Sequence, residues 1–209
     1  MLIKSEVVEK IGFLDEEYIL ALYEDTDYSM KASAAGYRCV IAKGSYIWHH
    51  GHGSTGKVKK INTIAEKNKE RFYKKWGRPL RVLWAAPENA GSPEINDILA
   101  SCVELARDGN YLYLFMPRPR PVLRQEVFRE AGLIEHANVH LKFYRGKNFK
   151  WACLWQVLIK RKKKYDLVIT PDAGAASLLK GFRIFYRAMI LATLDFDTVL
   201  SKVHDLKHK

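Results

Sequence analysis

"RVLWAAPENAGSPEINDILASCVELARDGNYLYLFMP", residues 81–117, is the stretch that decides the fold. It begins and ends with a short apolar run typical of a buried strand, at 81–86 and at 110–117. Between the two runs, apolar side chains recur at helical spacing, at Ile95, Ile98, Leu99, Cys102, Val103 and Ala106. Ser92 is the expected N-cap of this helix, and Pro93 stands at its first position. A strand, a helix and a second strand in this order predict a parallel sheet.

The same alternation continues to the C-terminus. Strand-like runs follow at 138–144, 165–172 and 188–194, and helical patterns occupy 121–131, 151–162 and 174–188. We therefore expect residues 79–209 to form a small Rossmann-like α/β domain, with a domain boundary near residue 78.

The first 78 residues have a different pattern. Helices are expected at 4–11, 24–35 and 58–76, and extended stretches at 37–42 and 45–49. Gly36 is well placed as the C′ residue of the second helix. The overall prediction is an α/β protein made of residues 1–78 and 79–209.

The composition limits the class of protein. The chain has 209 residues, is 48% hydrophobic and carries a net charge of +12, which favours an anionic partner. Its cysteines are far apart and odd in number, so they support neither a disulfide framework nor a zinc finger. A secretory signal and an apolar run of about 18 residues are both absent, and we expect a cytoplasmic protein.

Carboxylates cluster in "YEDTDYSMKASAAGY", residues 23–37. Glu24, Asp25 and Asp27 lie within four positions and repel one another. Capping of a helix is one explanation. The other is chemistry, with a carboxylate acting as a base or as a metal ligand.

The cluster belongs to an ordered series of elements: Gly12, Asp15-Glu16, Glu24-Asp25, Gly36-Tyr37, His49 and Gly53-Ser54. This series resembles the C-terminal half of the catalytic domain of family 2 glycosyltransferases, which have a GT-A fold. The resemblance implies transfer of a sugar, with inversion, from a nucleotide-sugar donor to a glycan or lipid-linked acceptor.

The resemblance also implies residue roles. Asp25 corresponds to the base, and Glu24 to its neighbour that orients it or contacts the acceptor. Asp15 and Glu16 correspond to acceptor-binding residues. His49 corresponds to a ligand of the Mg²⁺ or Mn²⁺ ion that neutralises the leaving diphosphate.

Family 2 enzymes begin with a nucleoside-binding strand and then an Asp-x-Asp metal element. Residues before Gly12 supply neither, so we expect a truncated GT-A domain that is inactive by itself. The Asp-x-Asp pattern at 25–27 begins a helix instead of ending a strand, and the pattern at 195–197 comes too late in the family's order.

A second candidate site follows the strand at 165–172. Asp172, Gly174 and Ser177 stand at a helix start, where an anion can bind. Residues 79–209 also loosely resemble the N-terminal Rossmann-like domain of GT-B glycosyltransferases.

Two basic runs, 57–81 and 142–164, are interleaved with aromatic residues. They are interpreted as solvated faces, as surfaces for an anionic membrane, or as nucleic-acid contacts. Because no nucleic-acid motif is present, that partner is the least favoured. The alternative to an enzyme is thus a non-catalytic basic α/β module that binds an anionic membrane surface or nucleic acid. In either case the expected location is the cytoplasm or the inner face of the membrane.

Overall fold

The computed structural model describes residues 1–19, 22–42, 44–46, 48, 60–117, 124–144, 148–159 and 164–209. These residues divide into two compact units, Met1–Arg78 (unit 1) and Pro79–Lys209 (unit 2). The hydrophobic clusters of one unit share no residue with those of the other.

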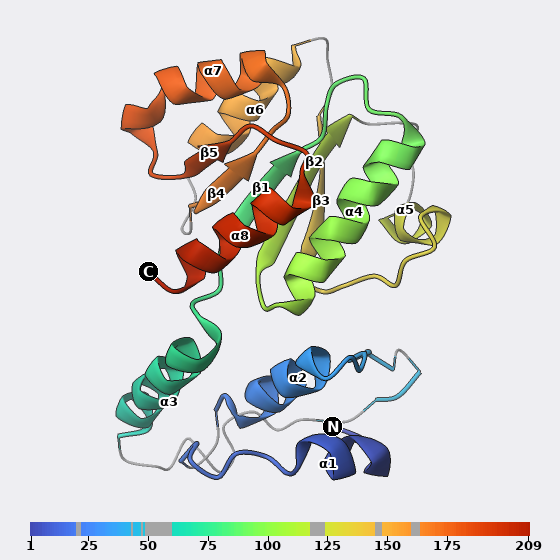
Figure 1. Ribbon diagram of the computed structural model, residues 1–209, viewed down its shortest axis with the longest axis vertical. Helices are drawn as coiled ribbons and strands as arrows, with labels where there is room; N and C mark the ends of the chain where they lie inside the picture. The colour runs from blue at the N-terminus through green and yellow to red at the C-terminus, as the bar shows by residue number, and fades with distance from the viewer. Residues whose placement is uncertain are drawn as a thin grey trace. The chain divides into compact units, whose positions relative to one another are not determined.

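A parallel sheet forms the centre of unit 2 (Figure 1). Its five strands are β1 (Arg81–Ala85), β2 (Tyr111–Pro117), β3 (Val139–Tyr144), β4 (Leu167–Ile169) and β5 (Met189–Leu191). Their order is β3-β2-β1-β4-β5, and every neighbouring pair is parallel. In the register, Leu83 lies opposite Tyr113 on one side and Val168 on the other. This confirms the predicted α/β class and gives unit 2 a Rossmann-like order that reverses between β1 and β4.

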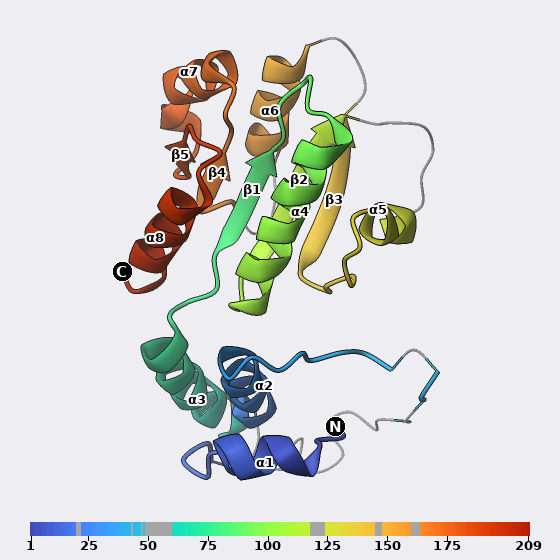
Figure 2. The same ribbon diagram turned by 45° about the vertical axis from the view of Figure 1, so that its right-hand side comes forward.

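Helices cover both faces of the sheet (Figure 2). One face is covered by α4 (Ser92–Arg107), α5 (Arg124–Glu130) and α8 (Phe196–Lys207), and the other by α6 (Phe149–Leu158) and α7 (Ala173–Gly181). Along β1, Val82 and Trp84 pack in the first layer, and Leu83 and Ala85 in the second. The side chains of both layers are buried, which explains why the strands are continuous apolar runs in the sequence.

Several predicted boundaries in unit 2 were wrong. Gly91, not Ser92, is the N-cap of α4, so the helix begins one residue early. The helix predicted at 174–188 ends at Gly181 and is followed by a short 3₁₀ helix, η2 (Arg183–Phe185). The helix α8 was not predicted from the sequence. Lys207 of α8 forms an ion pair of 3.0 Å with Asp108, which follows the last residue of α4.

Unit 1 contains α1 (Ser5–Ile11), α2 (Glu24–Ala34) and α3 (Ile61–Trp76). The expected role of Gly36 at the end of α2 is confirmed by its φ of +88°. The Tyr37 amide donates to the Ala32 carbonyl, and the Gly36 amide to that of Ser33, each at 3.0 Å. These two bonds form a Schellman motif, which needs a left-handed residue at C′.

The strand predicted at 37–42 is wrong, because these residues have no strand pairing. The strand predicted at 45–49 is also wrong at residues 45, 46 and 48, the residues of this range that the structure describes, because none of them is in a strand. A strand needs a second backbone to pair with, and the described part of unit 1 supplies none. In neither unit do the described residues form a helix long and apolar enough to cross a membrane.

Candidate functional site

Asp27 is the buried carboxylate of the acidic cluster. It is inaccessible to solvent and accepts hydrogen bonds from the indole Nε1 of Trp76 at 2.7 Å and from the hydroxyl of Tyr18 at 3.2 Å. The ammonium group of Lys75 lies 2.8 Å from its Oδ1, and that of Lys31 lies 3.5 Å from its Oδ2. Asp27 therefore joins α2 to α3 and to the loop that precedes α2.

Two opposing effects set the pKa of Asp27. Burial by itself would raise this pKa, but the hydrogen bonds from Lys75 and Trp76 and the charge of Lys75 outweigh burial and lower it. Burial and the nearby Asp27 carboxylate raise the pKa of Tyr18, so its hydroxyl remains a neutral donor. The charged form of Asp27 is thus the form that the fold stabilises.

The loop before α2 is held by side chains of α3. The amide of Asn68 donates to the carbonyls of Ile19 and Leu22, both at 3.1 Å. The guanidinium of Arg71 donates to the carbonyl of Glu17 at 2.7 Å. These bonds fix the path of the chain into the helix.

The last two residues before α2 have left-handed backbones. Leu22 has φ of +80° and Tyr23 has φ of +83°. Such a conformation costs about 1 kcal/mol or more for each residue with a side chain. The Asn68 bond to Leu22 and the packing of the Tyr23 ring on Phe72, with centroids 5.3 Å apart, offset this cost. The chain therefore enters α2 through a strained turn, and Glu24 is the first residue after it.

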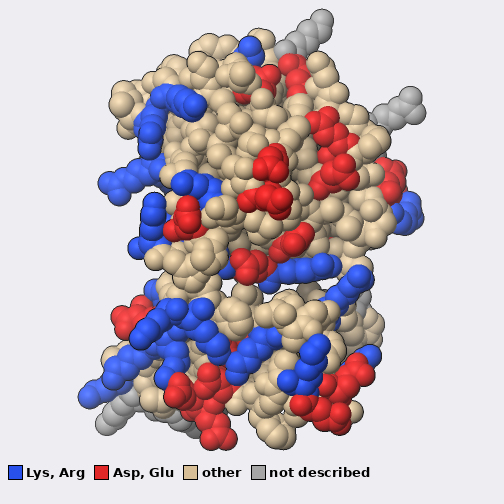
Figure 3. Space-filling model, in the orientation of Figure 1, with Lys and Arg blue, Asp and Glu red and all other residues tan. Residues whose placement is uncertain are grey.

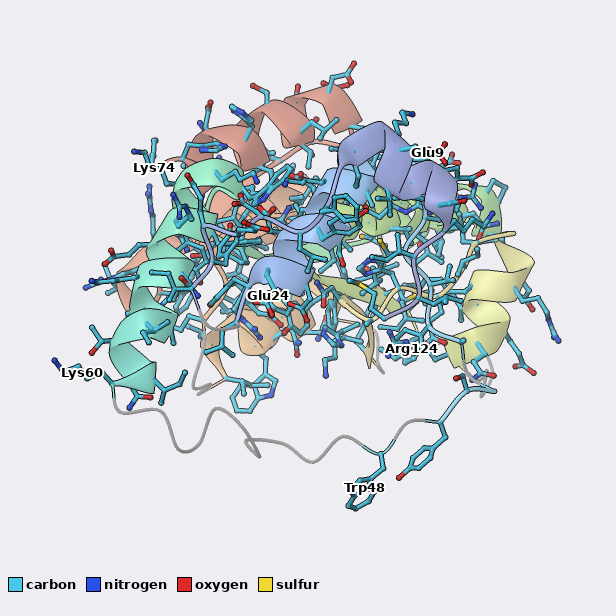
Figure 4. All side chains as sticks on the ribbon, turned by 90° about the horizontal axis from the view of Figure 1, so that it is seen from below. Glu9, Glu24, Trp48, Lys60, Lys74 and Arg124 are labelled. Atoms are coloured by element: carbon cyan, nitrogen blue, oxygen red, sulfur yellow. The ribbon has the colours of Figure 1, made fainter. Side chains whose placement is uncertain are left out.

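Asp25 and Glu24 differ from Asp27. Asp25 is exposed, and its Oδ1 accepts from the amide of Thr26 at 2.7 Å and from the Thr26 hydroxyl at 3.2 Å. Glu24 is half-buried at the start of α2, as labelled in Figure 4. Its Oε2 is buried and has no hydrogen-bond partner among the described residues. The cluster thus has one structural acid and two that the fold leaves accessible or unpaired.

The other predicted acceptor residues lie in the loop before α2. Asp15 is partly buried, accepts from the amide of Glu17 at 3.1 Å and lies 3.5 Å from the ammonium of Lys75. Lys75 therefore links Asp15 to Asp27. Glu16 is exposed.

The predicted metal ligand, His49, lies outside the described residues, and so do His50 and His52. Among the residues that are described, no three His, Cys, Asp or Glu side chains gather to hold a metal ion. The geometry of the described residues therefore assigns no cation to Asp25 or Glu24.

A groove of about 700 Å³ in unit 1 was not predicted from the sequence. Its walls come from residues 1–4, α1, α2 and residues 37–40. Tyr28 and Ser29 of α2 line it, and the buried hydroxyl of Tyr28 has no partner within the described part of the chain. The Ser29 hydroxyl donates to the backbone carbonyl of Asp25 at 2.8 Å, so Asp25 lies one helical turn from the groove.

At the second predicted site, Asp172 caps α7. Its Oδ1 accepts from the amide of Ala175 at 2.6 Å. The end of the Lys150 side chain occupies the space that a Cβ on Gly174 would need, and Ser177 is exposed. The Asp172 carboxylate opposes an anion at this helix start, whereas the Lys150 ammonium favours one.

Fold and site together define an α/β protein with a Rossmann-like unit and a helical unit that presents a Glu-Asp pair. No family model, curated protein or solved structure matches the chain.

Proposed function

We propose that the chain is part of an inverting glycosyltransferase in which Asp25 is the general base. The observation that carries the proposal is the division of the acidic cluster. Asp27 is buried and holds α2 in place, whereas Asp25, two residues away, is exposed. The bonds from α3 account for Asp27, whereas the carboxylate of Asp25 bonds to its neighbour Thr26 and is exposed to an acceptor. The ordered elements around it, from Gly12 to Ser54, give the same assignment by resemblance.

The proposed reaction moves one sugar. The acceptor hydroxyl attacks the anomeric carbon of the nucleotide-sugar, the bond from that carbon to the diphosphate oxygen breaks, and the nucleoside diphosphate leaves with the bonding electrons. Asp25 takes the proton of the attacking hydroxyl, which makes its oxygen a better nucleophile. Attack from the side opposite the leaving group inverts the anomeric centre.

Two further features support an acceptor at this place. The Oε2 of Glu24 has no partner among the described residues and can accept a hydrogen bond from a second hydroxyl of the sugar acceptor. A buried oxygen that lacks a hydrogen bond costs about 1–3 kcal/mol. The groove beside Ser29 is on the same face of α2 as Asp25, because the two residues are four positions apart. An elongated glycan or lipid-linked acceptor could lie in it.

The resemblance also implies Mg²⁺ or Mn²⁺, which would neutralise charge on the leaving diphosphate. We assign no step to the ion, since its expected ligand, His49, lies outside the described residues.

The test is a transfer assay with the polypeptide of the full reading frame that contains this chain. Nucleotide-sugars serve as donors, and lipid extracts and glycans as acceptors. Asp25→Asn removes the base but keeps the shape of the side chain, so we expect kcat to fall by about 100-fold or more with an unchanged melting temperature.

Thr26→Ala is the matched control, because it removes the hydroxyl that contacts Asp25 and leaves the carboxylate. We expect that variant to keep transfer within about threefold of the wild type, as for the loss of one exposed contact. Full activity of Asp25→Asn would remove this residue from the mechanism.

A further inference from the structure

We propose that unit 2 binds the surface of an anionic lipid membrane through the α6–η2 face. This face is defined by its apolar residues, Trp151, Trp155, Phe182, Ile184 and Phe185. The proposal does not depend on the glycosyltransferase assignment.

The exposure of these side chains is unusual. Trp151 is 57% exposed and Trp155 is 69% exposed, although both belong to a helix with a single charged residue. Ile184 is 87% exposed and Phe185 is 61% exposed. A helix that is apolar on every side is normally covered on every side. The sheet covers only one side of α6, through Cys153, Leu154 and Val157 in the second core layer.

Ring contacts join the apolar side chains into one surface. Trp151 packs edge-on against Phe182 with ring centroids 6.5 Å apart, and Phe182 packs against Phe185 at 6.2 Å. Trp155 is one turn along α6 from Trp151 and therefore shares its side of the helix. The surface spans two elements that the fold holds side by side.

Cations predominate around this surface. Lys150, Lys180, Arg183 and Arg187 are all exposed, and none forms an ion pair among the described residues. The sequence has no Asp or Glu from residue 173 to residue 194. Figure 3 shows Lys and Arg where α7 ends and the chain returns toward β5, whereas Asp and Glu gather over α4. The surface is complementary to negative charge.

The basic run of α3 does not offer a comparable surface. Its aromatic residues are turned inward, because Phe72 is buried and packs with Tyr73 and Trp76. Three of its cations also have partners within unit 1: Lys69 pairs with Glu66, Arg71 with Glu17, and Lys75 with Asp27. Of the two basic runs in the sequence, only the second places aromatic side chains outside.

Anionic lipid fits the α6–η2 face better than nucleic acid does. Exposed Trp, Phe and Ile side chains enter the boundary between headgroups and acyl chains, where Trp is favoured. Ile184, the most exposed of them, has no ring on which a base could stack. Each surrounding Lys or Arg strengthens partitioning onto anionic lipid by about fivefold.

The experiment measures partitioning of the full chain onto phosphatidylcholine vesicles with about 30% phosphatidylglycerol, a composition with a negative surface potential. We expect binding to these vesicles, and weak binding to phosphatidylcholine alone. The triple variant Lys180→Gln, Arg183→Gln and Arg187→Gln should lose about 100-fold in partition coefficient. The double variant Ile184→Ser and Phe185→Ser should lose about 10-fold while keeping its net charge.

One control removes equal charge elsewhere on unit 2, and a second removes one exposed apolar side chain there. They are Arg107→Gln, Arg129→Gln and Lys209→Gln together, and Ile134→Ser, all at exposed positions. We expect both controls to partition within about threefold of the wild type, since long-range charge effects are screened by salt. A control loss equal to the variant loss would overturn the proposal, because net charge alone would then explain binding. The proposal is also overturned if the α6–η2 variants bind vesicles normally but lose binding to a single-stranded RNA.

Discussion

Replacing Asp27 by Asn tests how unit 1 is held together. The Asn side chain keeps one oxygen, which can still accept from both Trp76 and Tyr18 because both donate to Oδ1, but its amino group then replaces Oδ2 and faces the ammonium of Lys75, 3.0 Å away. It also leaves Lys75 without the charge that lies 2.8 Å away. Removing one partner of a buried ion pair costs about 3–5 kcal/mol. We expect no more than about 3 kcal/mol, the lower end, because the Lys75 side chain is 33% exposed, and because Asp15 lies 3.5 Å from its ammonium and remains as a substitute.

Amide hydrogen exchange is the assay, because it reports on the two units separately. A loss of about 3 kcal/mol corresponds to exchange that is about 100-fold faster in α2 and α3. Amides of β1, β2 and β4 should exchange at their wild-type rates, since unit 2 has its own core. The matched control is Asp25→Asn, the same change two residues away at an exposed position, which should cost under about 0.5 kcal/mol. Equal effects of the two changes would refute the structural role of Asp27.

The pH dependence follows from the lowered pKa of Asp27. The stability that the charged form provides is present above the pKa of an unfolded aspartate, about 3.9. It is lost as the pH falls through the lower pKa of the folded state. The wild type should therefore show faster exchange of α2 and α3 as the pH falls below about 4, after correction for intrinsic rates. Asp27→Asn should lack this part of the acid dependence, and an unchanged acid profile would contradict the assignment.

The remaining predictions concern backbone conformation and thiol burial. Gly36→Ala should destabilise unit 1 by about 1 kcal/mol, because the backbone φ of Gly36 is +88°. Gly174→Ala should be neutral or stabilise unit 2 by up to about 1 kcal/mol, because only the flexible end of the Lys150 side chain must move. Denaturant unfolding of each variant measures the change in the free energy of unfolding. In the native protein, a thiol reagent should modify one cysteine, the exposed Cys39, and all three after unfolding. Burial raises the pKa of the Cys102 and Cys153 thiols. Prompt reaction of either thiol in the native state would contradict its buried position.

How much of the site could be predicted depended on how local its interactions are. The end of α2 was predictable, because the Schellman motif is closed by residues within a few positions of Gly36. The roles of the three acids were not, since the partners that distinguish Asp27 from Asp25 include Lys75 and Trp76, 48 and 49 residues away. Charge and residue type are the same at both positions.

The amino-acid sequence by itself determined the layered part of this protein. The strand at 111–117 has no charged or amide side chain, because both faces of a parallel sheet are buried, and that pattern is visible without coordinates. The tertiary structure alone decided which acid is buried, that residues 37–42 form no strand, and that Trp151 and Trp155 point outward while Phe149 is buried. The physical reason is that burial and strand pairing depend on a second segment that is distant in the chain. A local sequence pattern does not specify which distant segment packs or pairs with it.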